Sequence, residues 1–259
     1  MPLRSSRSLV GWRKFTLSLL STICVCTIIC VCTIVASSLL AAEGQSAIAE
    51  PAYPHASAPA DTATAGQSLA WLMEGNERFR MGQSIHPHQT RQRRDEVVAG
   101  QKPFAVILTC ADSRVAPEVV FDQGIGDLFV IRVAGNIADD AVLASIEYAV
   151  EHLDSPLVVV MGHSKCGAVT AAADAYANHT RPPGHLSALT DAIEPAVAAQ
   201  IPGPDLASRA IDANVANVVE RIGQDGPIAH LVEQEKVSIV GGRYDLETGE
   251  FTLLDDSMD

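Results

Sequence analysis

The chain has little positive charge and few aromatic side chains. Its 259 residues include 18 Lys and Arg against 31 Asp and Glu, a formal net charge of −13 at pH 7, and only 5% are aromatic. Residues 1–49 hold four basic residues and one acid, which leaves 14 basic and 30 acidic residues in the remainder. Proteins that bind nucleic acid usually present a basic patch to the phosphates. The charge balance therefore argues against nucleic acid as a partner.

Cysteine is scarce outside one apolar stretch near the N-terminus. Four of the six cysteines lie in that stretch, at Cys24, Cys26, Cys30 and Cys32. The rest of the chain holds only Cys110 and Cys166. Two cysteines exclude a framework of several disulfides, although in an exported protein they can still form one bridge.

The apolar stretch itself predicts an export segment. FTLSLLSTICVCTIICVCTIVASSLLAA, from Phe15 to Ala42, has no charge, and the lead before it is basic. A basic lead and a long apolar run are typical of a secretory signal, and 28 residues also suffice to span a bilayer. The small residues Ala47–Ala49 offer a cleavage site. A cleaved signal, a retained anchor and a buried core helix are the three interpretations.

Under the first two interpretations, residues 1–49 direct the rest of the chain to the periplasm or to the extracytoplasmic face of the inner membrane. The membrane is then contacted only through this segment. The region up to Gln67 is rich in Ala, Pro, Ser and Thr and has no periodicity. It predicts a flexible tether over residues 50–67, before one folded domain over residues 68–257.

Strand-like and helix-like segments alternate along the folded part. PFAVILTC, DLFVIRVAG and PLVVVMG are continuous apolar runs, typical of strands buried on both faces. Helices are expected at 68–82, with Ser68 as the N-cap, and at 139–154, in the Ala-rich segment after GHSKCG, and at 184–200, 205–224 and 228–235. The ending KVSIVGGRYDLETGEFTLLD predicts a hairpin at the sheet edge. This order predicts an α/β fold, with a mainly parallel central sheet flanked by helices and an antiparallel C-terminal edge strand.

Reactive side chains gather at two of the predicted strand ends. Cys110 ends the first strand, and His163 and Cys166 follow the third. In parallel sheets ligands bind beyond the carboxyl ends of the strands. Two thiolates and one imidazole form the ligand set of a catalytic zinc site, which keeps its fourth position open. We therefore expect one Zn²⁺ per chain, whereas His86 and His88 are interpreted as solvated loop residues.

Several motifs together resemble the β-class carbonic anhydrases over about residues 68–257. They are CADSRV (110–115), DLFVIRVAGN (127–136), IEYAVEHL (146–153), MGHSKCGAV (161–169) and GGRYDLETGEFTLL. The resemblance implies a zinc enzyme that reversibly hydrates CO₂ to bicarbonate and a proton through zinc-bound hydroxide. It also implies a homodimer or a dimer of dimers.

The resemblance also gives roles to further residues. Asp112 would accept a hydrogen bond from the hydroxide, or in a closed state become the fourth zinc ligand, and Arg114 would keep it ionised and oriented. Gln101 and the backbone N–H of Gly167 would donate to substrate oxygen. An apolar CO₂ pocket would be lined by Phe129, Ala134 and Tyr148.

Three other interpretations stay open. A related enzyme would hydrolyse another heterocumulene, such as CS₂, with the same zinc chemistry. A non-catalytic zinc protein would keep the fold alone, although Asp112 and Arg114 are both present. Finally, Cys110 and Cys166 would form a disulfide without metal.

Overall fold

The computed structural model describes residues 63–254, which belong to a unit that extends from Glu50 to Asp259. The predicted export segment and most of the predicted tether lie outside the described residues. Within residues 63–254, no helix has both the length and the hydropathy needed to cross a bilayer.

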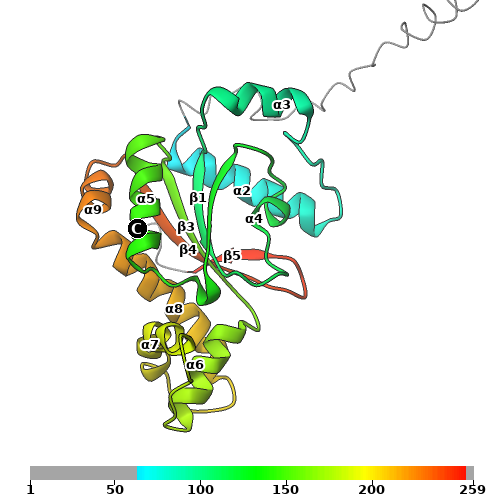
Figure 1. The fold of residues 1–259 in the computed structure, drawn as a ribbon. Coiled ribbons are helices and arrows are strands. Elements are labelled where there is room, and N and C mark those ends of the chain that lie inside the picture. Colours follow the sequence, from blue (N-terminus) through cyan, green and yellow to red (C-terminus); the bar gives the residue numbers. More distant parts are fainter. Residues whose placement is uncertain (1–62, 255–259) are drawn as a thin grey trace, which may run out of the picture. The chain divides into compact units, whose positions relative to one another are not determined.

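A five-stranded sheet forms the centre of the described residues (Figure 1). Its order is β2-β1-β3-β4-β5, and only β5 runs antiparallel to its neighbour. The strands are β1 (Ala105–Thr109), β2 (Leu128–Arg132), β3 (Leu157–His163), β4 (Ser238–Tyr244) and β5 (Phe251–Leu253). The predicted fold class, including the antiparallel edge strand, is confirmed.

The register of the sheet sets the position of the reactive groups. Thr109, the last residue of β1, lies opposite Arg132 of β2 and Met161 of β3. His163, at the end of β3, lies opposite Tyr244 at the end of β4. The carboxyl ends of four parallel strands therefore meet at one edge of the sheet.

Helices cover both faces of the sheet and this edge. α2 packs on one face, whereas α5, α8 and α9 pack on the other, and α6 and α7 lie beyond the carboxyl ends of the strands (Figure 1). Their bounds are α2 (Ala65–Arg80), α3 (Arg91–Glu96), α4 (Pro117–Val120), α5 (Asp140–His152), α6 (Gly167–Ala177), α7 (Leu186–Ala198), α8 (Leu206–Gly223) and α9 (Gly226–Glu233). Two short 3₁₀ segments are η2 (Val97–Ala99) and η3 (Ala134–Asn136).

The first helix begins earlier than predicted. Thr64 is the N-cap: its hydroxyl accepts from the Gln67 N–H, and the Gln67 side chain accepts from the Thr64 N–H. This reciprocal capping box satisfies two backbone donors and starts the helix at Ala65, within the predicted tether. The expectation that Ser68 caps the helix was wrong, because Ser68 is buried inside it.

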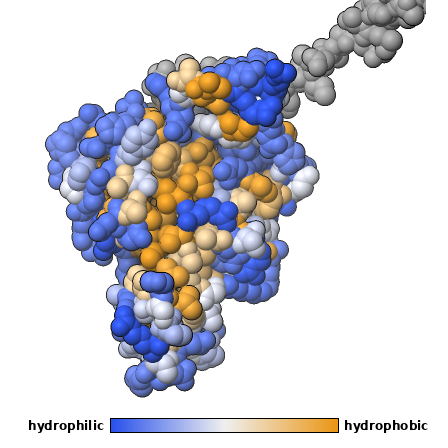
Figure 2. Space-filling model, viewed as in Figure 1, coloured by the Kyte–Doolittle hydropathy of each residue, from blue (hydrophilic) through white to orange (hydrophobic). Residues whose placement is uncertain are grey.

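Strand β2 is less buried than its apolar sequence predicts. Leu128 to Ile131 are half-buried and Arg132 is exposed, because β2 is the edge strand of the described sheet. The prediction of a strand buried on both faces was therefore wrong for a single chain. Figure 2 shows an apolar patch in the middle of the viewed face, where the strands lie in Figure 1.

Candidate metal centre

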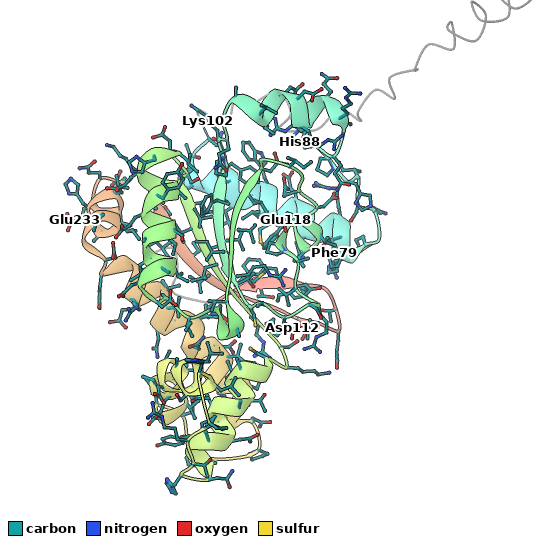
Figure 3. The ribbon with its side chains drawn as sticks, viewed as in Figure 1. Phe79, His88, Lys102, Asp112, Glu118 and Glu233 are labelled. Atoms are coloured by element: carbon teal, nitrogen blue, oxygen red, sulfur yellow. The ribbon has the colours of Figure 1, made fainter. Side chains whose placement is uncertain are left out.

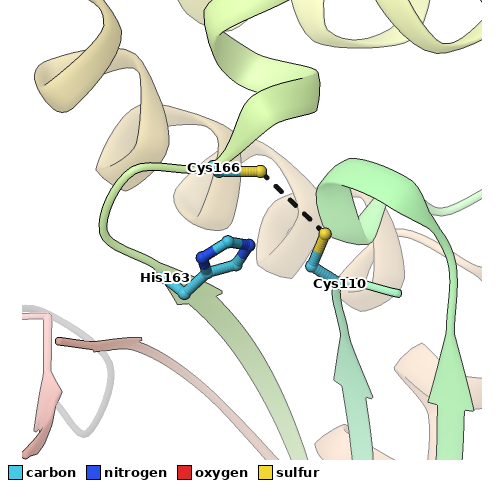
Figure 4. Close-up of side chains that lie close together, drawn as sticks. All are labelled: Cys110, His163 and Cys166. Atoms are coloured by element: carbon cyan, nitrogen blue, oxygen red, sulfur yellow. Dashed lines mark hydrogen bonds between the residues drawn. The ribbon is translucent and has the colours of Figure 1, made fainter. Parts of the chain in front are cut away.

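Cys110, His163 and Cys166 converge at the carboxyl edge of the sheet (Figure 4). Cys110 follows β1, His163 ends β3, and Cys166 is the N-cap of α6. Their ligand atoms lie within 4.8 Å of one another, and all three residues are buried. The fold thus assembles the zinc ligand set predicted from the sequence.

The His163 imidazole presents a free lone pair to this cluster. Its Nδ1 lies 2.9 Å from the carbonyl oxygen of Ser164. A carbonyl can only accept a hydrogen bond, so Nδ1 carries the proton and neutral imidazole is unprotonated at Nε2. Nε2 is fully buried and has no hydrogen-bond partner among the described residues. A buried acceptor of this kind fits a metal ligand.

The sulfur atoms of Cys110 and Cys166 lie within hydrogen-bonding distance of each other. They lie 4.0 Å apart as free cysteines, far beyond a disulfide bond of about 2.05 Å. The hydrogen bond from Cys166, helped by the Gly135 N–H at 3.3 Å, holds the pKa of Cys110 well below its usual range. The same bond, together with burial, raises the pKa of Cys166. A divalent cation would displace this last proton.

Asp112 and Arg114 form a bidentate pair beside the cluster. Arg114 donates from Nε to Oδ1 at 2.9 Å and from Nη2 to Oδ2 at 2.7 Å, and its backbone N–H also donates to Oδ1. The guanidinium holds the pKa of the Asp112 carboxyl well below its usual range. Asp112 Oδ2 lies 4.0 Å from His163 Nε2, too far for a hydrogen bond. The structure therefore has the Arg114-paired form of Asp112.

Two further residues, unassigned from the sequence, hold the Cys110–Arg114 loop. Arg132 donates from Nη2 to the Asp112 carbonyl at 2.7 Å and from Nε to the Cys110 carbonyl at 3.3 Å. Gly135 aims its N–H at Cys110 Sγ with φ of +73°, and a Cβ there would lie 2.6 Å from Ile193. Only glycine fits this position. Both residues lie in the motif RVAGN, and this motif was the sequence feature that could have indicated their role.

Two of the predicted substrate-pocket residues lie close to the metal ligands. Gly167 follows Cys166 directly at the start of α6, and Ala134 precedes Gly135, whose N–H contacts Cys110. Gly167 is exposed, with open space where a Cβ would stand. Its position allows the approach of a small ligand.

The other three predicted pocket residues lie far from the cluster in one protomer. Gln101 precedes β1 whereas Cys110 follows it, and five strand residues span roughly 17 Å. Figure 3 shows Lys102, the neighbour of Gln101, and Asp112 at opposite ends of the strands. Phe129 lies opposite Val106 near the start of β1, and the Tyr148 ring packs 6.3 Å from it. Gln101, Phe129 and Tyr148 therefore do not line the metal centre of their own protomer.

His88 is not a solvated loop residue as predicted. It is half-buried, and its Nδ1 lies 2.8 Å from both carboxylate oxygens of Asp127. The His88 carbonyl also accepts from the Ile125 N–H, which ties this loop to the segment before β2. His86 is exposed.

Residues 105–251 match the family model described as carbonic anhydrase. This chain belongs to that family. Carbonic anhydrase 2 of Mycobacterium tuberculosis is 44% identical over 192 residues, covering 72% of this chain and 92% of that protein. The β-carbonic anhydrase CcaA superposes with a TM-score of 0.57 at 29% identity, over 72% of this chain and 87% of that one.

A third comparison supports the fold alone. A tetrameric β-carbonic anhydrase from Sordaria macrospora superposes with a TM-score of 0.58 at 23% identity, over 73% of this chain and 97% of that one. The family match and the likeness to CcaA place the chain in the β class of the family. The cluster of Cys110, His163 and Cys166 is typical of the zinc site of β-carbonic anhydrases.

Proposed function

We propose that this carbonic anhydrase carries out the reversible hydration of CO₂ to bicarbonate and a proton at the Cys110–His163–Cys166 centre. The observation that carries the proposal is the convergence of these ligands beside an ionised Asp112 paired with Arg114. Zn²⁺ held by Cys110, His163 and Cys166 would lower the pKa of a water molecule to about 7 and so would supply the nucleophile at neutral pH.

The protein's own residues orient the reactants. Asp112 Oδ2 faces the side on which His163 Nε2 lies, at 4.0 Å, so it can accept a hydrogen bond from the attacking water. Arg114 keeps Asp112 ionised and fixes both of its oxygens. The Gly167 N–H, at the first position of α6, has no partner within that helix and can donate to the developing bicarbonate.

Stopped-flow CO₂ hydration by the purified, metal-checked protein tests this function. We expect activity that disappears when zinc is removed and returns when it is restored. The same preparation assayed with CS₂ tests the related hydrolase. No CO₂ hydration by the fully zinc-loaded protein would reject the proposal.

We further propose that the chain works as a homodimer or a dimer of dimers. The half-buried apolar strand β2 at the sheet edge supports this, since exposed apolar edges usually mark an interface. The placement of Gln101, Phe129 and Tyr148 at the far end of β1 also supports it. A second copy is needed to bring these residues to a metal centre.

We also propose that residues 1–49 export the protein, with residues 50–67 as a tether and 68–257 as the enzyme domain. The basic lead and the uncharged run from Phe15 to Ala42 support export to the periplasm or the outer face of the inner membrane. The helix that begins at Ala65 belongs with the enzyme domain, which shortens the proposed tether by three residues.

A further inference from the structure

The turn between β4 and β5 contacts the metal-binding loop through Ser164. The Ser164 N–H donates to the Tyr244 carbonyl at 2.9 Å, and the Ser164 hydroxyl accepts from the Leu246 N–H at 2.9 Å. The Ser164 carbonyl accepts from His163 Nδ1. Ser164 is 5% exposed, so these bonds are shielded from water. One buried residue thus links the turn to a metal ligand.

The turn is itself tightly organised. Asp245 Oδ1 accepts from the N–H groups of Glu247 and Thr248, both at 2.9 Å, and from the Thr248 hydroxyl at 3.2 Å. The Thr248 N–H, with the Glu247 N–H and the Ser164 hydroxyl, lowers the pKa of the Asp245 carboxyl. Lys165, next to Ser164, forms an ion pair with Glu247. The turn therefore has a fixed shape against which Ser164 rests.

A buried asparagine fixes the far side of the turn. Asn76 of α2 donates to the Gly249 carbonyl at 2.9 Å and to the Val120 carbonyl at 3.1 Å. Its Oδ1 accepts from the Phe251 N–H at 2.8 Å. Asn76 is 3% exposed. The chain of contacts thus extends from the first described helix, through the C-terminal hairpin, to His163.

We propose that Ser164, held by the β4–β5 turn, is a positioning residue that aims His163 Nε2 at the metal. The orientation of the imidazole depends on the Nδ1–H bond to the Ser164 carbonyl, and the direction of that carbonyl depends on the bonds that Ser164 makes to Tyr244 and Leu246. Partners behind a metal-binding histidine commonly fix its tautomer and ring orientation. The inference rests on the zinc centre of the proposed function, but not on CO₂ as the substrate.

The test compares Ser164→Ala with Ser164→Thr, which keeps the hydroxyl, and with Ser187→Ala as a matched control. The Ser187 hydroxyl donates only to the Gly184 carbonyl in the described structure, at the start of α7. Zinc affinity is measured by competition with a chromophoric chelator, and the ligand geometry by the absorption spectrum of the Co²⁺-loaded protein. We expect Ser164→Ala to bind zinc about 10–100-fold more weakly, with an altered Co²⁺ spectrum. Ser164→Thr and Ser187→Ala should resemble the parent protein in both measurements.

Parent-like zinc affinity and Co²⁺ spectrum in Ser164→Ala would overturn the inference, even if its metal-free form melted at a lower temperature. If Ser164→Ala does not fold, Thr248→Ala takes its place, since it removes two exposed bonds of the turn, the one donated to Asp245 and the one accepted from the Glu250 N–H. A smaller loss of zinc affinity in Thr248→Ala would support the inference, and unchanged affinity would count against it. A parent protein that binds zinc but does not hydrate CO₂ would reject the proposed function alone.

Discussion

The carboxylate of Asp112 lies between the Arg114 guanidinium and the His163 imidazole. It accepts hydrogen bonds from Nε and Nη2 of Arg114, and its Oδ2 faces His163 Nε2 at 4.0 Å. Asp112→Asn preserves the size of the side chain but removes its charge, and Arg114→Ala removes the partner that keeps Asp112 ionised. Both changes leave the three zinc ligands in place.

We expect both variants to retain zinc but lose most CO₂ hydration. A lost partner behind a metal centre typically costs about 10–100-fold, and a lost acid–base partner about 10²–10⁴-fold. Stopped-flow rates on metal-checked protein give the answer. Near-normal rates with full zinc would mean that the pair only holds the loop together.

The metal ligands make a second prediction at the residue scale. The parent protein should contain about one zinc per chain, and His163→Ala should lose most of it because a buried ligand with a free lone pair is removed. His86→Ala is the matched control, since His86 is exposed in a loop. Elemental analysis measures both. Equal zinc in the two variants, or a Cys110–Cys166 disulfide in metal-free parent protein, would contradict the assignment.

The buried side chain of Asn76 joins three parts of the fold. It binds α2 to the chain before β5 and to the end of α4, and all of its partners are backbone groups. A buried polar group left without a partner costs about 1–3 kcal/mol. We therefore expect Asn76→Ala to lower the free energy of unfolding of the metal-free protein by about 1–3 kcal/mol or more.

The control for this prediction is Asn178→Ala. Asn178 is exposed, and its amide donates only to the Asp174 carbonyl within the described residues. Such surface changes usually stay within about 0.5 kcal/mol. Denaturant unfolding of both variants measures the difference, and equal stabilities would show that the Asn76 bonds do not hold the elements together.

The elements differ in how far their sequences predict them. The apolar runs of β1 and β3 predicted buried strands, because both strands lie inside the sheet and pack on both faces. β2 has an equally apolar sequence but lies at the edge, and sequence alone does not distinguish an inner strand from such an edge strand. Helices α3 and α4 were missed because six and four residues are too few to show helical periodicity.

The metal ligands could be predicted from the sequence, whereas the residues that hold them in position could not. Cys110, His163 and Cys166 have a recognisable chemistry and spacing, so their convergence followed from the strand ends. Ser164 and Asn76 act through backbone hydrogen bonds to residues about 80 and 175 positions away. Such bonds leave no local pattern, because any chain segment offers the same N–H and C=O groups.

At the scale of the whole molecule, residues 1–49 are expected to export the enzyme. Fused to a reporter that is active only outside the cytoplasm, they should give a signal, because a basic lead and an uncharged run are what the secretion machinery recognises. The control fusion starts at residue 50. The size of the fusion on a gel shows whether cleavage follows Ala47–Ala49, and a silent reporter would reject export.

The last prediction concerns how two copies build one site. Gln101 and the metal ligands lie at opposite ends of β1, so we expect Gln101 of one protomer to act at the metal centre of another. Gln101→Ala and Asp112→Asn should each be weakly active alone. In a hybrid dimer of the two, one centre combines native Asp112 from one chain with native Gln101 from the other. Because the two sites of a two-fold dimer are equivalent, the hybrid should recover about half of the parent activity.

Differently tagged chains, co-expressed and purified through both tags, give the hybrid. Its control is the hybrid of Asp112→Asn with Arg114→Ala, which should stay inactive because Asp112 and Arg114 pair within one chain and neither centre is restored. Activity in the first hybrid and not in the second would show that Gln101 crosses the interface. A first hybrid no more active than the average of its two parent variants would mean that Gln101 does not act in a neighbouring site, and that β2 meets its partner in another way.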